Sequence, residues 1–347
     1  RQYGFKTDVR TLLDMYRTME MEDCIAQSLN EYRQIALKLG TDPEYRQEIE
    51  TQIERLLKKG PERVSAFTIP KLMLNAAGGN ISIRYGLQGP NYTVATACAS
   101  ATNAIGDALK AIQYGDADIM ITGGTEAAIT PMGVGGFAAM RALSTRNDEP
   151  ERASRPFDRD RDGFMMTEGS ATLILEEMES AQARDAHIYG EILGSGSNAD
   201  AHHITAPAPG GNGAASCMQL AIEDAGLTSN EICYVNAHGT STPLNDAAEA
   251  EALSKVFGEN GPPVTSTKGV TGHALGAAGA LEATSILLSF DRRQIPPTAG
   301  FTNPDPELPD INLVAGAPQD WEPGPSMSNS FGFGGHNGCV ILAPVNT

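Results

Sequence analysis

The chain has 347 residues, a formal net charge of -18, 37 glycines and 6% aromatic residues. This length allows one large domain or two, and the acidic balance disfavours binding to nucleic acid or to anionic membrane surfaces. Five scattered cysteines without CxxC spacing argue against a disulfide framework and a zinc site, and no apolar run is long enough to cross a bilayer, so we expect a cytoplasmic protein without membrane attachment.

The N-terminal part of the chain has an amphipathic helical pattern. Apolar residues recur at helical spacing from Ile25 to Leu39, and Gly40 ends this run. Pro43 then stands at the first position of a second helical pattern, which Gly60 closes. Charged residues are frequent here, which is typical of a solvated helical face.

From Val64 onward, short apolar runs alternate with glycine turns and helical patterns. The first succession predicts a helix over 100–114 and strands over 92–97, 117–124 and 171–176. The second succession predicts the elements 232–237, 246–257 (helix), 264–267, 277–290 (helix), and a final strand pair near 326–329 and 339–342. Strands that alternate with helices imply largely parallel sheets covered on both faces, and the two successions suggest a duplicated half.

Cys98 lies where the predicted strand 92–97 meets the predicted helix 100–114. The helix dipole and the free N–H groups at this junction are expected to lower the thiol pKa below its free value of about 8.5. The same N–H groups can hold a developing oxyanion. Considered alone, a buried cysteine is better explained as a small core residue, so Cys98 is only a candidate nucleophile at this point.

Three glycine-rich loops hold the other candidate residues. His238 follows a predicted strand, where a turn role is as plausible as a catalytic one. His273 lies among small residues, and a phosphate-binding loop is disfavoured because neither GxxxxGK[ST] nor GxGxxG fits. The loop 329–338 sets Phe331 and Phe333 between glycines, which suits either a swinging aromatic gate or a plain hairpin turn.

Together these residues have the order and local contexts of one family. From about Leu56 to Leu342 the chain resembles the β-ketoacyl-[acyl-carrier-protein] synthases of the type I/II branch, especially bacterial synthase II. The matching strings are Ala95-Thr96-Ala97-Cys98, Gly135-Gly136-Phe137, Arg141-Ala142-Leu143-Ser144, Asn236-Ala237-His238-Gly239-Thr240-Ser241-Thr242, Thr267-Lys268, Thr271-Gly272-His273 and Asn329-Ser330-Phe331-Gly332-Phe333-Gly334-Gly335.

The resemblance implies an α/β, thiolase-like fold of two duplicated α/β halves in layers. We expect a nucleophile half over residues 48–180 and a histidine-bearing half over 181–347. Residues 1–47 do not match the family; around 28–32 and 39–44 they resemble the helical tail of O-linked N-acetylglucosamine transferases. The Val/Ile-rich strand with which family members begin is not found, so the first half is expected to be incomplete and preceded by a helical segment of unclear origin.

The resemblance also implies the reaction, a Claisen condensation in fatty acid chain elongation by an acyltransferase, 3-oxoacyl-[acyl-carrier-protein] synthase. Cys98 would carry the acyl group, and His238 and His273 would stabilise the enolate left when malonyl carrier protein loses carbon dioxide. Lys268, paired with Glu282, would orient the histidines. Two histidines distinguish this site from thiolases, which use a second cysteine, and from initiating synthases, which use asparagine; Cys339 is expected to be core.

The remaining roles also follow from the resemblance. The main-chain N–H groups of Cys98 and Phe333 would form an oxyanion hole, with Phe331 and Phe333 in the gate. The expected substrate-binding residues are Thr240, Thr242, Phe137 and Asn337. No metal or cofactor is expected, because substrates arrive on the phosphopantetheine arm of acyl carrier protein.

The expected partners are acyl carrier protein and a second copy of the chain in a homodimer. Arg141, Arg146 and Lys71 are the basic candidates for carrier docking. Two alternatives stay open: a catalytically impaired fragment or chimera that keeps only a dimerisation or carrier-binding surface, and a glycosyltransferase-related helical module at residues 1–47.

Overall fold

The computed structural model describes residues 3–6, 73–259 and 261–345, so both helices predicted before Gly60 lie outside the described residues. The chain divides into two compact units, and residues 73–93 belong to one while residues 3–6 and 94–345 belong to the other. In the first unit, helix α5 (Ala76–Tyr85) ends at Gly86, whose positive φ of 66° suits glycine. The second unit holds every candidate site residue.

The larger sheet of this second unit contains five strands in the order β4 (Glu191–Ala199), β10 (His336–Ala343), β9 (Ser326–Gly332), β5 (Tyr234–Asn236) and β6 (Val264–Thr265). β10 is antiparallel to both of its neighbours, whereas β5 is parallel to both of its own. The sheet is therefore mixed, and the expectation of largely parallel sheets was wrong. The cause is the tight turn between β9 and β10, because so short a connection can join only antiparallel strands.

The smaller sheet has three strands in the order β1 (Tyr3–Lys6), β3 (Gly169–Glu177) and β2 (Ile119–Glu126), all antiparallel. In the described part of the chain, β2 pairs only with β3. Residues 92–97 form no strand, contrary to expectation; instead Ala97–Ala99 form the 3₁₀ turn η3. Among the described residues, the smaller sheet therefore has fewer strands than the larger one.

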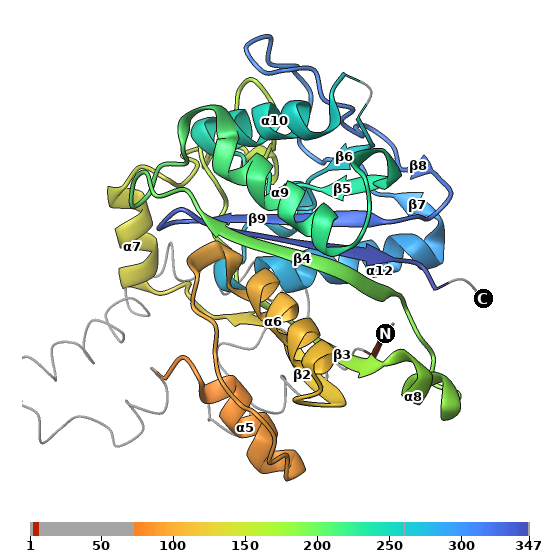
Figure 1. The fold of residues 1–347 in the computed structure, drawn as a ribbon. Helices are drawn as coiled ribbons and strands as arrows, with labels where there is room; N and C mark the ends of the chain where they lie inside the picture. Colours follow the sequence, from red (N-terminus) through yellow and green to blue (C-terminus); the bar gives the residue numbers. More distant parts are fainter. Residues whose placement is uncertain (1–2, 7–72, 260, 346–347) are drawn as a thin grey trace, which may run out of the picture. The chain divides into compact units, whose positions relative to one another are not determined.

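Two helices lie between the sheets (Figure 1). α6 (Ser100–Tyr114) packs mainly on β2 and α12 (Ala278–Arg292) mainly on β3, and both also contact the larger sheet. α9 (Asn212–Asp224) and α10 (Pro243–Phe257) form the layer on the other face of the larger sheet. The shorter elements are α7 (Pro131–Ala139), η4 (Pro150–Arg152), α8 (Met178–Ala183), η5 (Pro209–Gly211), η6 (Ser229–Glu231), α11 (Lys268–Thr271), η7 (Leu275–Ala277), β7 (Gln294–Ile295) and β8 (Gln319–Asp320).

Alternation along β10 supplies both hydrophobic cores. Val340 and Leu342 enter the core between the two sheets, while Cys339 and Ile341 enter the core beneath α9 and α10. Because successive side chains of a strand point to opposite faces, a strand covered on both sides can contribute apolar side chains to both cores, as this part of β10 does. Cys339 is fully buried and its Sγ donates to Asn329 Oδ1, which confirms its expected place in the core.

The two halves repeat one local structure. η3 and η7 are both three-residue turns, and each leads into a 15-residue helix, α6 or α12. Ala97 and Leu275 occupy equivalent positions in the left-handed region, with φ of 50° and 48°. Gly276 is therefore the counterpart of Cys98, and the two turns contact each other. This repeat supports the expected duplication and places the ends of both central helices beside one cavity.

Candidate active site

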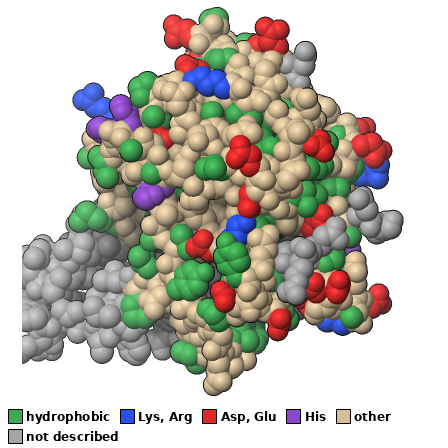
Figure 2. All heavy atoms as spheres, in the orientation of Figure 1, with side chains coloured by type: hydrophobic (Ala, Val, Ile, Leu, Met, Phe, Trp, Pro, Cys, Tyr) green, Lys and Arg blue, Asp and Glu red, His purple; other side chains and the backbone are tan. Residues whose placement is uncertain are grey.

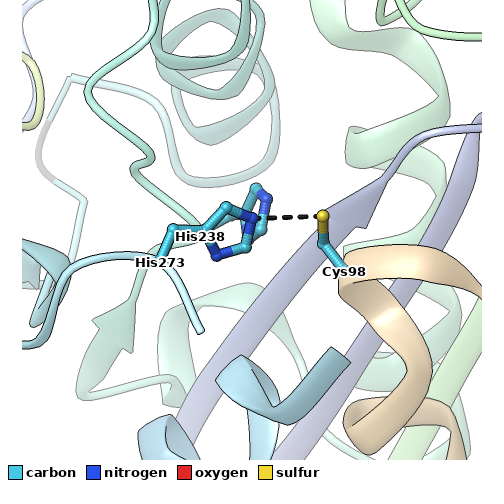
Figure 3. Close-up of side chains that lie close together, drawn as sticks. All are labelled: Cys98, His238 and His273. Carbon is cyan, nitrogen blue, oxygen red and sulfur yellow. Dashed lines mark hydrogen bonds between the residues drawn. The ribbon is translucent and has the colours of Figure 1, made fainter. Parts of the chain in front are cut away.

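Cys98, His238 and His273 converge although they come from three separate segments (Figure 3). The Cys98 Sγ and one nitrogen from each imidazole lie within 4.8 Å of one another. His273 Nε2 is 3.1 Å from Cys98 Sγ, and the two imidazole rings meet edge to face at a centroid distance of 5.2 Å. The geometry therefore supports a nucleophile beside two imidazoles.

The segments bring these side chains together for local reasons. Cys98 stands in η3, His238 follows the end of β5, and His273 follows α11. The His273 main chain is fixed by its N–H donating to the Met165 carbonyl at 2.7 Å and by its carbonyl accepting from Thr167 N at 3.0 Å. These two hydrogen bonds hold the main chain of His273 against residues 165–167.

Burial raises the pKa of the Cys98 thiol to about 11. Lys268 and the N–H groups of Phe333 and Cys98 act in the opposite direction but do not outweigh burial. The expectation that the helix N-terminus would hold this pKa below its free value was therefore wrong. Removing a thiolate from water destabilises it by more than the amides and the lysine stabilise it. The nucleophile rests as a thiol.

Because the thiol is protonated, a neighbouring base must take its proton. Burial first, and then Lys268, lower the pKa of His273 well below its ordinary value, so the ring is neutral at physiological pH. A neutral imidazole can accept the thiol proton through Nε2 at 3.1 Å. His273 is thus placed to activate Cys98.

We expect the alkylation rate of Cys98 by iodoacetamide to rise by about tenfold per pH unit between about pH 6 and 9, because only the thiolate reacts. Peptide mapping by mass spectrometry, with half-buried Cys233 as an internal reference, measures this rate at each pH. A rate that stays flat across the range would show a standing thiolate–imidazolium pair and contradict the thiol assignment.

A buried lysine supports His238. Lys268 Nζ donates to the His238 carbonyl at 2.6 Å and lies 3.3 Å from His238 Nδ1, and it forms an ion pair with Glu282. An ammonium is only a donor, so Nδ1 must accept and the proton of the neutral ring belongs on Nε2. Burial, then Lys268 and His273, lower the pKa of His238 well below its ordinary value. The ring is therefore a neutral N–H donor.

Glu249 is a site residue that the sequence reasoning missed. Its fully buried carboxylate accepts from His238 N at 2.8 Å and from Gly239 N at 2.7 Å, and so fixes the loop at the end of β5. Burial raises the pKa of Glu249 to about 7. A signal was present: Asp246, Glu249 and Leu253 share one face of the predicted helix 246–257, and two acids on a buried face need partners.

The loop between β9 and β10 passes directly over the nucleophile. A Cβ on Gly332 would lie 2.7 Å from the Thr96 carbonyl oxygen and 3.0 Å from Cys98 N, so only glycine permits this approach. The N–H groups of Phe333 and Cys98 both hydrogen-bond the Cys98 sulfur. Phe331 packs its ring against His238 at a centroid distance of 5.9 Å.

A cavity of about 340 Å³ opens at the Cys98, His238 and His273 side chains. Phe137 lines it and stacks edge to face on Phe164 at 5.3 Å. Thr240 and Thr242 also line it, with their hydroxyl oxygens 2.9 Å apart. The expected substrate-binding residues therefore share one cavity.

Asn337 lines the same cavity, but its amide nitrogen is occupied by protein. Nδ2 donates to Asn198 Oδ1 at 2.9 Å and to Asp200 Oδ1 at 2.7 Å. Since an amide nitrogen has two protons, both of its donors are used. In this structure Asn337 fixes the start of the 200–208 loop.

The surface carries both acidic and basic side chains. On the face drawn in Figure 2, acidic side chains are dispersed and Lys and Arg side chains are fewer. Arg141 lines the cavity, Arg146 donates to the Asp160 carbonyl at 3.1 Å, and Lys71 lies outside the described residues. Within the described ranges, none of the helices is both long and apolar enough to cross a membrane.

Two family models match the sequence. The model described as "Beta-ketoacyl synthase, N-terminal domain" matches residues 10–181, and the model described as "Beta-ketoacyl synthase, C-terminal domain" matches residues 189–302. The first match includes residues 10–47, which the sequence alone did not associate with this family.

Curated relatives agree with the family models. A 3-oxoacyl-[acyl-carrier-protein] synthase 2 of Coxiella burnetii is 49% identical over 299 residues, covering 86% of this chain and 72% of the relative. The enzyme of the same name from Synechocystis is 49% identical over 312 residues, covering 89% and 74%. That from Staphylococcus aureus is 51% identical over 291 residues, covering 83% and 72%.

Solved structures show the same fold. A ketosynthase of type II polyketide synthesis, solved in complex with its acyl-carrier protein, superposes with a TM-score of 0.82 at 33% identity, covering 86% of this chain and 74% of that one. A beta-ketoacyl synthase from Burkholderia phymatum gives a TM-score of 0.81 at 40% identity, covering 86% and 72%. These comparisons confirm the layered α/β fold expected from the sequence.

Proposed function

Because the chain belongs to the beta-ketoacyl synthase family, we propose that it condenses an acyl group held on Cys98 with malonyl-[acyl-carrier-protein]. The observation that carries this proposal is the 3.1 Å approach of His273 Nε2 to Cys98 Sγ beside a second neutral imidazole. The product is a 3-oxoacyl-[acyl-carrier-protein], as in fatty acid chain elongation. The reaction uses no cofactor beyond the phosphopantetheine arm, because the thioester itself is the activated group.

The first half-reaction loads the enzyme. His273 Nε2 accepts the Cys98 proton as the sulfur attacks the acyl thioester carbonyl, and the main-chain N–H groups of Cys98 and Phe333 receive the oxyanion. The carrier thiol leaves with a proton, and the acyl chain stays on Cys98. Phe137 and its aromatic neighbour Phe164 form an apolar wall suited to the acyl chain.

The second half-reaction forms the carbon–carbon bond. Malonyl-carrier loses carbon dioxide, and the electrons of the broken bond pass to the thioester oxygen as an enolate. Once Cys98 is acylated its sulfur has no proton to give, so the neutral His273 ring can take the Nε2–H tautomer and donate to that oxygen beside His238, which Lys268 holds as an Nε2–H donor. The enolate carbon then attacks the acyl carbonyl, and the Cys98 sulfur leaves as a thiolate that takes up one proton from solvent, the proton that the overall reaction consumes.

The further assignments rest on separate observations. Thr240 and Thr242 offer two adjacent hydroxyls to the amides of the phosphopantetheine arm, Asn337 holds the loop opposite them, and Phe331 and Phe333 form the gate. Binding to an acyl-carrier protein is supported by the ketosynthase solved with its carrier, and Arg141, which lines the cavity, is a docking residue in this proposal.

The oligomeric state, the cellular location and the boundary between the two halves are also proposals. A homodimer is supported by β2, which among the described residues pairs on one side only and where Ile119 is 52% exposed. A cytoplasmic location is supported by the four described cysteines, which are free thiols. The boundary between halves near residues 180 and 181 is supported by the limits of the two family models.

A catalytically impaired remnant is the second candidate. It is favoured by the smaller sheet, which has three strands among the described residues where the duplicated half has five. It keeps the surfaces for dimerisation or carrier binding and predicts no turnover.

Purified protein given hexanoyl- and malonyl-carrier protein is expected to form 3-oxooctanoyl-carrier with release of carbon dioxide, and mass spectrometry of the carrier measures the product. The Cys98→Ala variant is the matched control and forms none. If wild type and Cys98→Ala both give no product, the remnant is the correct description of this chain.

A further inference from the structure

The segment 154–167 lies outside the predicted elements, yet it hydrogen-bonds to the loops that hold His238, Lys268 and His273; we call it the strap. Ser154 Oγ donates to the Lys268 carbonyl at 2.6 Å, and Phe157 N donates to Asp246 Oδ2 at 2.8 Å. Met165 accepts from His273 N at 2.7 Å. The strap is therefore bonded to the loops that present both histidines and the lysine.

The strap holds the turn that carries the two cavity hydroxyls from both sides. Ser241, between Thr240 and Thr242, has a φ of 67°, which is strained for a residue with a side chain. Arg155 N donates to Ser241 Oγ at 3.0 Å, and Gly163 N donates to the Ser241 carbonyl at 3.1 Å. The strained turn is thus kept in place by bonds from the strap.

Arg161 continues this support into α10. Its side chain is 6% exposed, and its Nε and Nη2 donate to the carbonyls of Thr242 and Pro243 at 3.4 and 3.3 Å. Its Nη1 donates to Asp305 Oδ2 at 2.6 Å and to the Asp158 carbonyl at 2.9 Å. The guanidinium therefore fixes the main chain directly behind the Thr242 hydroxyl, while Thr240 and Thr242 face the cavity.

The position of Arg161 is unfavourable for α10, which indicates that the residue has another role. Thr242 is the N-cap of α10, and a cation at a helix N-terminus opposes the helix dipole. Two carboxylates offset the charge: Asp305 in direct contact, and buried Asp246, whose Oδ2 is 3.9 Å from Arg161 Nε. A neutral residue would not oppose the dipole of α10. It would lack the planar guanidinium fork, however, whose N–H groups donate to two carbonyls at once.

We propose that Arg161 is a positioning residue that holds the Thr240 and Thr242 hydroxyls where they bind the amides of a pantetheine-linked thioester. This inference rests on the proposed function and adds to it the residue that makes the site selective for substrates with the full arm. Arg161 acts through the main chain of Thr242 and Pro243 and does not itself touch substrate.

The test compares two acyl donors that differ only in the arm. Hexanoyl-pantetheine carries both amides of the arm, whereas hexanoyl-N-acetylcysteamine lacks the outer part. Intact-mass measurement of Cys98 acylation gives a rate constant for each donor, so condensation is not required. We expect wild type to prefer the pantetheine ester, and Arg161→Lys, which keeps the charge but loses the fork, to reduce that preference on the order of tenfold. The N-acetylcysteamine ester keeps only the inner amide, so its rate should fall much less.

The control and a second variant separate positioning from folding. Arg159, whose side chain is 58% exposed two residues away, serves in Arg159→Lys as the matched control, and its preference should equal that of wild type. Adding Arg161→Lys to Thr242→Val should lower the preference no further than Thr242→Val alone, because Arg161 acts through Thr242, whose hydroxyl at 2.9 Å holds that of Thr240. Thermal unfolding of each variant confirms that it is folded.

The outcomes are distinct. A wild type without preference for the pantetheine ester, equal loss of both rates in Arg161→Lys, or no change in either rate overturns the inference and leaves the proposed function standing. Additive effects of Arg161→Lys and Thr242→Val also overturn it. A wild type that neither donor acylates overturns the proposed function, and this inference with it.

Discussion

Replacing His238 with alanine is expected to separate the two half-reactions. His238 makes no hydrogen bond to the Cys98 sulfur among the described contacts, whereas His273 Nε2 lies 3.1 Å from it, so acylation of Cys98 should be little changed. Condensation should fall on the order of 10²- to 10³-fold, because a donor aimed at the developing enolate is removed. Intact mass measures the acylation, and release of labelled carbon dioxide from malonyl-carrier measures the second step.

The exposed His187 provides the control for this prediction. Its ring packs on Tyr189 at a centroid distance of 4.5 Å, away from the residues that line the cavity, and His187→Ala should leave both half-reactions at wild-type rates. Equal loss of acylation and decarboxylation in His238→Ala would contradict the division of labour between the two histidines.

Lys268→Met is expected to have the largest effect on stability. The lysine and Glu282 are 1% and 2% exposed and form an ion pair, so removing the lysine leaves a buried carboxylate without its counter-charge. Breaking a buried pair in this way costs about 3–5 kcal/mol of unfolding free energy. The loss should be larger at neutral than at acid pH, because burial already raises the pKa of Glu282 and protonation removes the unpaired charge. Urea denaturation at both pH values measures it.

The double variant Lys268→Met/Glu282→Gln distinguishes charge from packing. Neutralising the carboxylate should recover much of the stability lost in Lys268→Met while leaving condensation impaired, since the ammonium that sets the His238 tautomer is gone. A double variant no more stable than the single one would show that the lysine contributes through packing rather than through its charge.

The central helices could be predicted because their signals are local, and the clustering of Cys98, His238 and His273 because the three motifs together resemble one family. The helix predicted over 100–114 has the observed bounds, and the one predicted over 277–290 differs from α12 by one residue at its start and two at its end. Cys98, His238 and His273 lie together as their shared resemblance implied.

Other elements depend on contacts that spacing does not show. β4 was not predicted, because its glycines have the composition of a loop. A Cβ on Gly194 would lie 2.4 Å from Ala225 N, and one on Gly196 would lie 2.4 Å from the Cys217 carbonyl oxygen, so the strand needs glycine for α9 to pack against it. The missed roles of Glu249 and Arg161 also arise from bonds to the main chain of distant residues.

The error in the Cys98 pKa has the same origin. Of the N–H groups near the start of α6, that of Cys98 does act to lower the pKa, and the N–H of Phe333 from the loop between β9 and β10 acts in the same direction. Burial, which depends on the whole fold, acts in the opposite direction and is larger. The local rule therefore gave the direction in which the N–H groups act but not the protonation state of Cys98.

The central claim is that Cys98 of this chain carries the acyl group that malonyl-carrier consumes. A single-turnover measurement tests it: the protein is loaded from hexanoyl-carrier, freed of excess donor, and then mixed with malonyl-carrier while peptide mapping follows all five cysteines. The account predicts an acyl adduct on Cys98 alone, which disappears as 3-oxooctanoyl-carrier appears. An adduct on another cysteine, no adduct, or an adduct on Cys98 that malonyl-carrier does not discharge would contradict it.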